Sequence, residues 1–207
     1  MANRNGDMYG LTVLSPIIND PALKVSHDTA LRIYLQKLPR HEQSPFAGVS
    51  GTHLCRLVVM DDVVFVGHPA KEEHLKSKYL IFTSNLYGDP DAYLEGMART
   101  HPQVVEDIWS HCVGFPGAKD PMAFADYIRK CQLETTFFFA DVNDKTVEQT
   151  LRALQMKVEF TAFVEENQGK SPVELQKEFA RFWERFGQLQ LPQPGAKELT
   201  RHLAPGV

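Results

Sequence analysis

The sequence predicts an α+β domain in which helices pack against an antiparallel sheet. Three observations lead to this fold class. Four segments are rich in Val, Ile, Phe and Tyr, two of them are joined by a short connection, and helical periodicity occurs between and after them. The chain has 207 residues, 43% hydrophobic and 23% charged, which is the composition of a globular protein. This length suffices for one domain of ordinary size, or at most two small ones.

The first predicted strand spans residues 9–17 and ends near Pro16. A helix is expected to follow, with Asp20 as its N-cap and Pro21 in its first turn. Apolar residues recur in it every three or four positions, which is typical of a helix with one buried face, and Pro39 ends it. These residues are Ala30, Leu31, Tyr34, Leu35 and Leu38.

The second predicted strand spans residues 52–66, with a bulge or turn expected near Asp61–Asp62. Residues 67–77 are polar, and the next strand spans residues 78–85. Because the connection between the two strands is short, we expect them to pair as an antiparallel hairpin.

Three further helices are predicted after this strand, two of them from residues that commonly begin helices. Asp89 is expected to cap one that begins at Pro90, a second follows His101-Pro102, and a third covers about residues 122–130. Residues 135–142 (TTFFFADV) are predicted to form the fourth strand because they are aromatic and β-branched.

Two long helices complete the predicted fold, from Asp144 to about Glu166 and from Ser171 to about Phe186. We therefore expect a single domain over residues 8–188 and a flexible tail over residues 189–207.

The predicted order is β-α-β-β-α-β followed by two helices, which is the order of ferredoxin-like folds. The second strand is apolar on both faces, with Leu54 and Val58 on one and Leu57 and Val59 on the other. Both sheet faces should therefore be covered. Helices should cover one face. The other face could be covered by a partner sheet, by the C-terminal helices or by a ligand cavity.

Over roughly residues 8–142, this order and the two-sided apolar sheet resemble the dimeric α/β-barrel superfamily, in which two ferredoxin-like units pack sheet to sheet. The resemblance implies a homodimer that binds a small-molecule ligand or substrate. Members of the superfamily include haem-binding peroxidase-like enzymes, haem-degrading and cofactor-free monooxygenases, small isomerases and ligand-sensing modules.

His53 and Arg56 are polar residues at the start of an otherwise apolar strand. An imidazole can ligate iron or transfer protons, and a guanidinium can bind a carboxylate or a developing oxyanion. Strict alternation puts the two side chains on opposite faces unless a bulge intervenes. The ordinary alternative is that His53 bonds to nearby backbone and Arg56 pairs with a surface carboxylate.

His111 and Cys112 are adjacent at the end of a predicted helix, and either side chain can ligate a metal or haem iron. The alternative is structural: Gly114 and Pro116 shape a tight turn, and Cys112 fills a small space in the core.

Asn85 follows the third strand, where binding groups are common, although asparagine also serves turns. The last helix carries an aromatic stripe that is core, a dimer interface or a hydrophobic ligand pocket. Its members are Phe179, Phe182, Trp183 and Phe186.

These residues support three functional expectations. The first is a haem-associated oxidoreductase, peroxidase- or monooxygenase-like, with a pocket between sheet and helices. His53 or His111 would ligate the cofactor, Arg56 would polarise bound oxygen or hold a substrate carboxylate, and Asn85 would orient the substrate. The second is a non-catalytic dimeric ligand-binding or interaction module. The third is a cofactor-free isomerase or monooxygenase, with the Asp141 carboxylate as its acid or base.

Charge and cysteine content limit the partners and the compartment. The net charge of −4 argues against nucleic-acid binding, and no apolar run approaches the roughly 20 residues that span a membrane. The N-terminal sequence has no apolar signal region. Three cysteines without CxxC spacing favour reduced thiols, so we expect a cytoplasmic protein.

Overall fold

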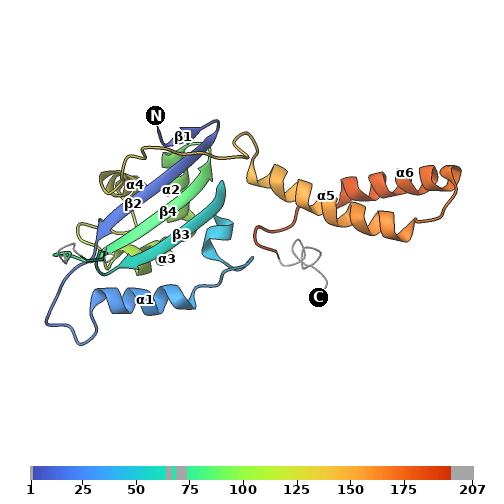
Figure 1. The fold of residues 1–207 in the computed structure, drawn as a ribbon. Helices are drawn as coiled ribbons and strands as arrows, with labels where there is room; N and C mark the ends of the chain where they lie inside the picture. Colours follow the sequence, from blue (N-terminus) through green and yellow to red (C-terminus); the bar gives the residue numbers. More distant parts are fainter. Residues whose placement is uncertain (1, 64–66, 69–73, 197–207) are drawn as a thin grey trace.

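The structure is a computed structural model that describes residues 2–63, 67–68 and 74–196. It has an α+β fold whose sheet has four antiparallel strands in the order β1-β2-β4-β3 (Figure 1). The strands are β1 (Arg4–Asn5), β2 (Met8–Pro16), β3 (Thr52–Met60) and β4 (Tyr79–Tyr87). The expected antiparallel pairing of β3 with β4 is confirmed.

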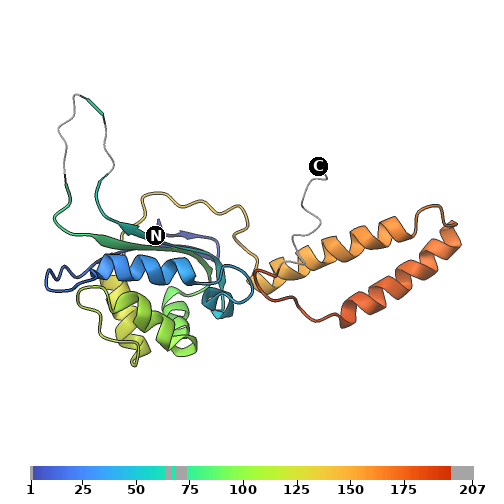
Figure 2. The same ribbon diagram turned by 90° about the horizontal axis from the view of Figure 1, so that it is seen from below.

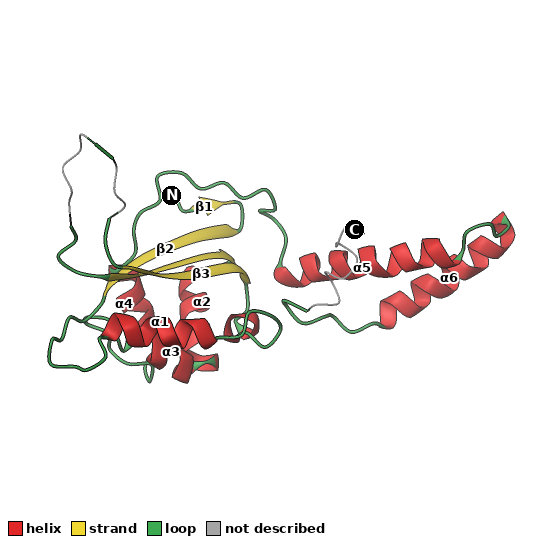
Figure 3. Cartoon of the chain, turned by 60° about the horizontal axis from the view of Figure 1, so that its bottom comes forward, coloured by secondary structure: helices red, strands yellow, loops and turns green. Residues whose placement is uncertain are grey.

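Helices cover one face of this sheet (Figure 2 and Figure 3). They are α1 (His27–Lys37), α2 (Pro90–Thr100), α3 (Pro102–Trp109) and α4 (Pro121–Lys130). At the centre of the core, Phe82 of β4 contacts Trp109, which in turn contacts Phe124. Both contacts are edge-to-face, and all three side chains are fully buried.

The start of the first helix differs from the prediction. Asp20 accepts a hydrogen bond from the backbone of Ala22 and forms a local turn, whereas α1 begins after its N-cap Ser26. The intervening Leu23 and Val25 are exposed, so a helical turn there would bury no apolar surface. α1 ends at Lys37, and Leu38 is extended, as expected for a residue before proline.

The predicted fourth strand over residues 135–142 does not form. The chain adds to the free edge of β2 only briefly, where Leu133 donates a backbone hydrogen bond to Thr12 (2.8 Å). Further along that edge, the backbone N–H and carbonyl oxygen of Gly10 are both hydrogen-bonded to Asn3. They are therefore not free to pair with the incoming chain. Residues 134–146 therefore leave the edge and cross the second face of the sheet, opposite the helices (Figure 3).

This crossing segment, residues 134–146, keeps the alternation that its sequence predicts. Phe138 packs on Gly10 of β2, while Phe137 and Phe139 point away and are exposed. Leu54 and Val58 of β3 are also exposed, and no helix among the described residues covers them. We call this side of the sheet the open face.

The two C-terminal helices form a hairpin that extends away from the sheet (Figure 1). They are α5 (Val147–Glu166) and α6 (Pro172–Gln188), and capping boxes at Thr146 and Ser171 begin them. Phe163 packs with Phe182 and Phe186 in a small core separate from that of the sheet. The C-terminal helices of the same copy therefore do not cover the open face.

The first part of the predicted tail contacts α5. Arg152 donates a hydrogen bond to the carbonyl oxygen of Leu189 (3.0 Å), and Gln155 donates one to that of Gln190 (2.9 Å). Residues 197–207 of the predicted tail, and residues 64–66 of the long predicted strand, lie outside the described residues. Within the described ranges, no helix combines the length and apolar character needed to cross a bilayer.

Candidate functional site

Arg56 and Asn85, two of the predicted site residues, lie close together in the sheet. Arg56 pairs with Thr83 of β4, and Asn85 is two residues further along that strand. Phe82 and Ser84 are buried and point toward the helices, so the alternate residues Thr83 and Asn85 point to the open face. Arg56 lies on the same face as its partner Thr83. Their backbone positions are diagonal neighbours, which brings long side chains within reach of each other.

A cavity of about 460 Å³ lies beside β3, which is the edge strand of the sheet. The C-terminal turn of α1, the loop after it and a 3₁₀ turn over Pro45–Gly48 form its walls together with β3. Its lining residues are Leu35, Leu38, Pro39, Arg40, Ser44, Phe46, Cys55, Arg56 and Leu57. We call it the β3 cavity, and Arg56 is the predicted site residue that borders it.

The β3 cavity combines an apolar wall with two positive charges. Leu35, Leu57 and the buried Phe46 pack against the main core and hold the wall in place. Arg40 and Arg56 are exposed, and within the described ranges neither forms an ion pair. Arg32, in contrast, is paired with Asp61. Such a lining suits an amphipathic anion, whose apolar part would contact the wall and whose negative charge would lie near the arginines.

Chemical groups for catalysis are scarce in the β3 cavity. Burial raises the pKa of the Cys55 thiol to about 11, so it is a neutral thiol near pH 7 and a weak nucleophile. The other polar groups of the lining are the Ser44 hydroxyl and the two guanidinium groups. Carboxylates and imidazoles, the usual general bases, are absent from this lining.

His53 lies in a bulge at the start of β3. Thr52 pairs with Leu86 and Leu54 pairs with Asn85, which leaves His53 as the extra residue of a bulge. The bulge predicted from the sequence was near Asp61–Asp62, at the other end of the strand. Burial lowers the pKa of its imidazole, and the nearby backbone of Lys145 partly offsets this effect. The ring is therefore neutral near pH 7, and its Nε2 is buried without a hydrogen-bond partner in the described structure.

His111 and Cys112 lie at the other end of the sheet. His111 accepts a backbone hydrogen bond from Ile18, just beyond β2, and its Nδ1 lies 2.9 Å from Nδ1 of His27. Burial, followed by the neighbouring His27, lowers the pKa of His111. Cys112 is buried, and burial raises the pKa of its thiol to about 12.

The residues expected to hold a haem therefore do not form one site. His53 is at the start of the nine-residue strand β3, and His111 is beyond its far end. A strand rises about 3.3 Å per residue, so more than about 20 Å separates the two histidines. Among the described residues, no group of three or more His, Cys, Asp or Glu side chains could hold a metal ion.

Arg40, Ser44 and Phe46 are cavity residues that sequence reasoning did not identify. They lie in a segment whose Gly and Pro content indicates only a polar loop. A single arginine between two prolines, Pro39 and Pro45, was the available signal, and it does not reveal that the loop folds against β3.

Comparisons with known proteins add no family assignment. No protein-family model matches the chain, and neither a curated protein nor a solved structure matches it significantly.

Proposed function

We propose that this chain is a small-molecule-binding module that holds an amphipathic anion, such as a medium-chain carboxylate, in the β3 cavity. The observation that carries this proposal is the pair of arginines, Arg40 and Arg56, beside an apolar wall and without acidic partners in the described structure. The apolar body of the ligand would contact Leu35, Leu38 and Leu57, and its carboxylate would accept hydrogen bonds from the guanidinium groups.

The size and chemistry of the cavity support a binding role. Its volume of about 460 Å³ is within the range of small-molecule sites. Its lining has no general base, which favours the ligand-binding alternative over catalysis in this cavity. Asn85 on the neighbouring strand offers an amide to any part of the ligand that extends over the open face.

Decanoate and its neutral analogue decanol provide the test, with binding measured by titration calorimetry. Decanoate should bind more tightly, and Arg56→Gln and Arg40→Gln should each weaken its binding by about tenfold or more, the effect of a lost charge-assisted hydrogen bond. Arg181→Gln is the matched control, because Arg181 is an exposed arginine of α6 far along the chain from this cavity.

Amide chemical shifts locate the bound molecule. Decanoate should perturb residues 35–46 and 55–57 and leave the hairpin α5–α6 unchanged. Equal affinities for decanoate and decanol, or equal effects of the three arginine variants, would contradict the proposal.

One observation favours a second candidate, the haem-associated oxidoreductase. The neutral imidazole of His53 has a buried Nε2 without a partner in the described structure, which is the chemical state that iron ligation requires. An absorption titration with haem tests it. A Soret band that saturates at equimolar haem, is lost in His53→Ala and persists in His111→Ala is the expected result for this candidate. A spectrum identical to that of free haem would contradict it.

A further inference from the structure

Two histidines far apart in the sequence meet at one end of the sheet. His27 is the first residue of α1, and His111 lies just after α3. Their Nδ1 atoms are 2.9 Å apart, and both side chains are partly buried. We call these two residues the histidine pair. Their contact joins the start of α1 to the segment that follows α3.

The two rings are placed for a hydrogen bond between the Nδ1 atoms. The centroid of an imidazole ring lies about 1.15 Å from Nδ1, so two rings aligned across the 2.9 Å contact would have centroids about 5.2 Å apart. The observed separation of the centroids is 5.2 Å. A metal ion bound by both nitrogens at this spacing would bring the centroids to about 4.5 Å. One Nδ1 therefore carries a hydrogen, and the other accepts it.

This bond limits how many protons the histidine pair can hold. The donating ring can take a proton at its Nε2 while the bond stays intact. The accepting Nδ1 cannot be protonated without loss of the bond, because two N–H groups would then face each other on two charged rings. Burial and the neighbouring His27 lower the pKa of His111, which fits His111 as the acceptor.

The charges of α3 do not cancel this effect. Asp107 favours the protonated form of His111, but its Oδ1 accepts a hydrogen bond from Gln103 (2.7 Å), and the pKa of His111 is still lowered. Glu106 accepts a backbone hydrogen bond from the loop after α3 (2.9 Å). Burial, followed by Asp107, raises the pKa of Tyr34 on α1 to about 12, so this neighbouring phenol is neutral.

The charged groups on the other elements around the histidine pair are engaged with their own partners or exposed. Asp28 of α1 binds Lys78, just before β4 (2.6 Å). In the loop before α1, Asp20 binds the backbone of its own turn, and Lys24 is exposed. The thiol of Cys112 is neutral because burial raises its pKa to about 12.

The segment after α3 is held more firmly than the start of α1. The carbonyl oxygen of His111 accepts a hydrogen bond from Ile18 (2.9 Å), and the next residue forms a β-bridge just beyond β2. In the described structure the N-cap Ser26 makes no side-chain bond to the helix, and residues 20–26 are exposed. Loss of the bond between the histidines should therefore release the first turn of α1.

We propose that the histidine pair is a pH-sensitive latch, which holds the first turn of α1 near neutral pH and releases it in mildly acidic solution. The closed state binds fewer protons than the open state, because the accepting Nδ1 is blocked. It is therefore fully favoured above the ordinary imidazole pKa of about 6.5 and is progressively lost as the pH falls through that value. The latch does not depend on the ligand proposed for the β3 cavity.

Amide hydrogen exchange followed by NMR tests the latch. The backbone N–H of Ala30 bonds to the carbonyl oxygen of Ser26 in the first turn of α1 (3.0 Å) and reports its opening. Its protection, corrected for the intrinsic exchange rate, should fall about tenfold between about pH 7.5 and about pH 5.5.

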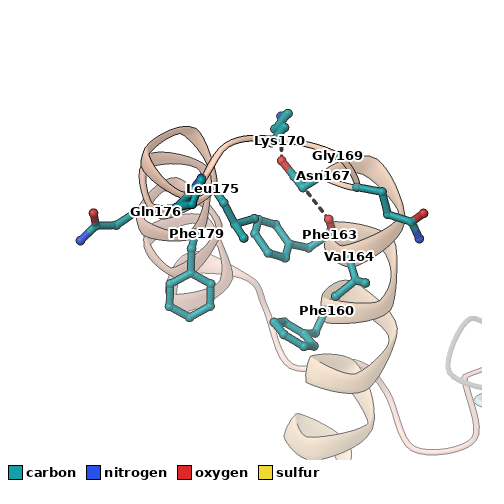
Figure 4. Close-up of a pocket in the computed structure, with 11 residues that line it drawn as sticks. Phe160, Phe163, Val164, Asn167, Gly169, Lys170, Leu175, Gln176 and Phe179 are labelled. Carbon is teal, nitrogen blue, oxygen red and sulfur yellow. Dashed lines mark hydrogen bonds between the residues drawn. The ribbon is translucent and has the colours of Figure 1, made fainter.

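The hairpin α5–α6 is the internal reference for this measurement. Residues 147–188 contain no histidine, and the closed end of the hairpin is lined mainly by apolar and amide side chains (Figure 4). Protection of its amides should therefore stay constant over the same pH range.

Variants on either side of the contact separate the latch from general effects of acid. In His27→Gln or His111→Gln, the glutamine amide can donate to the remaining imidazole or accept from it, so the contact survives protonation. The change in Ala30 protection should then shrink to less than about threefold. His41→Gln is the matched control, because His41 lies in the loop after α1 near Glu42, and the tenfold change should persist.

The tautomers of the two rings give a second readout, which a merely structural contact would not produce. Side-chain nitrogen NMR near pH 7.5 should show His27 protonated at Nδ1 and His111 protonated at Nε2. Near pH 5.5 both rings should give imidazolium signals. Two rings both protonated at Nε2, a protection of Ala30 that does not change with pH, or a pH dependence that His111→Gln leaves intact would each overturn the proposal.

Discussion

Replacing Trp109 by alanine is expected to lower the free energy of unfolding by about 3–5 kcal/mol. Trp109 is fully buried, and its ring lies between Phe82 of the sheet and Phe124 of α4, with centroid separations of 5.5 and 5.1 Å. Alanine would remove both edge-to-face contacts and leave a cavity between the sheet and two helices.

Trp109→Phe should cost much less than Trp109→Ala. The indole Nε1 is buried without a hydrogen-bond acceptor in the described structure, so phenylalanine removes an unsatisfied donor while it keeps an aromatic ring in place. Urea unfolding followed by circular dichroism measures both variants. Met122→Ala is the control at an exposed position of α4 and should change the free energy of unfolding by less than about 0.5 kcal/mol. A Trp109→Ala cost as small as that of the control would contradict this packing.

Gly10→Val is expected to lower the free energy of unfolding by about 1–3 kcal/mol. A β-carbon on Gly10 would lie 2.7 Å from the ring of Phe138, so valine must displace the ring and the crossing segment that carries it. In a Phe138→Ala background the space is free, and Gly10→Val should be neutral or stabilising because valine favours strands.

A double-mutant cycle measures this coupling as the non-additive part of the unfolding free energy. Gly96→Ala is the control, since a β-carbon there meets no atom within 4 Å and α2 should be stabilised. An equal cost of Gly10→Val with and without the Phe138 ring would show that Phe138 does not pack on the sheet.

Much of the fold could be predicted because its signals are local. Asp89-Pro90, His101-Pro102 and Ser171-Pro172 begin α2, α3 and α6 as expected, since a cap and the first turn of a helix involve only neighbouring residues. The β3–β4 hairpin was predictable for the same reason: chain connection and alternation specify its partner.

The candidate site was predictable only in part. Arg56 and Asn85 stand out as polar residues in apolar strands. They share the open face because Arg56 pairs with Thr83, which lies on the same side of β4 as Asn85. Arg40, Ser44 and Phe46 were not predictable, because their role depends on how the loop after α1 packs against a strand edge. The separation of His53 from His111 likewise follows from strand order and direction, which residue type does not reveal.

Local sequence patterns were enough to predict the α+β fold class, most helix starts and the alternating faces of the strands, because these features depend on contacts within a few residues. The tertiary structure determines whether residues 135–142 form a strand. Their composition suits a strand, but a strand needs an unoccupied edge, and Asn3 takes the backbone positions on β2 that they would have used. It also decided that the open face is crossed by a single segment and that the hairpin α5–α6 extends from the sheet. These two features depend on which of several distant segments packs against the sheet, and a local sequence pattern does not show this.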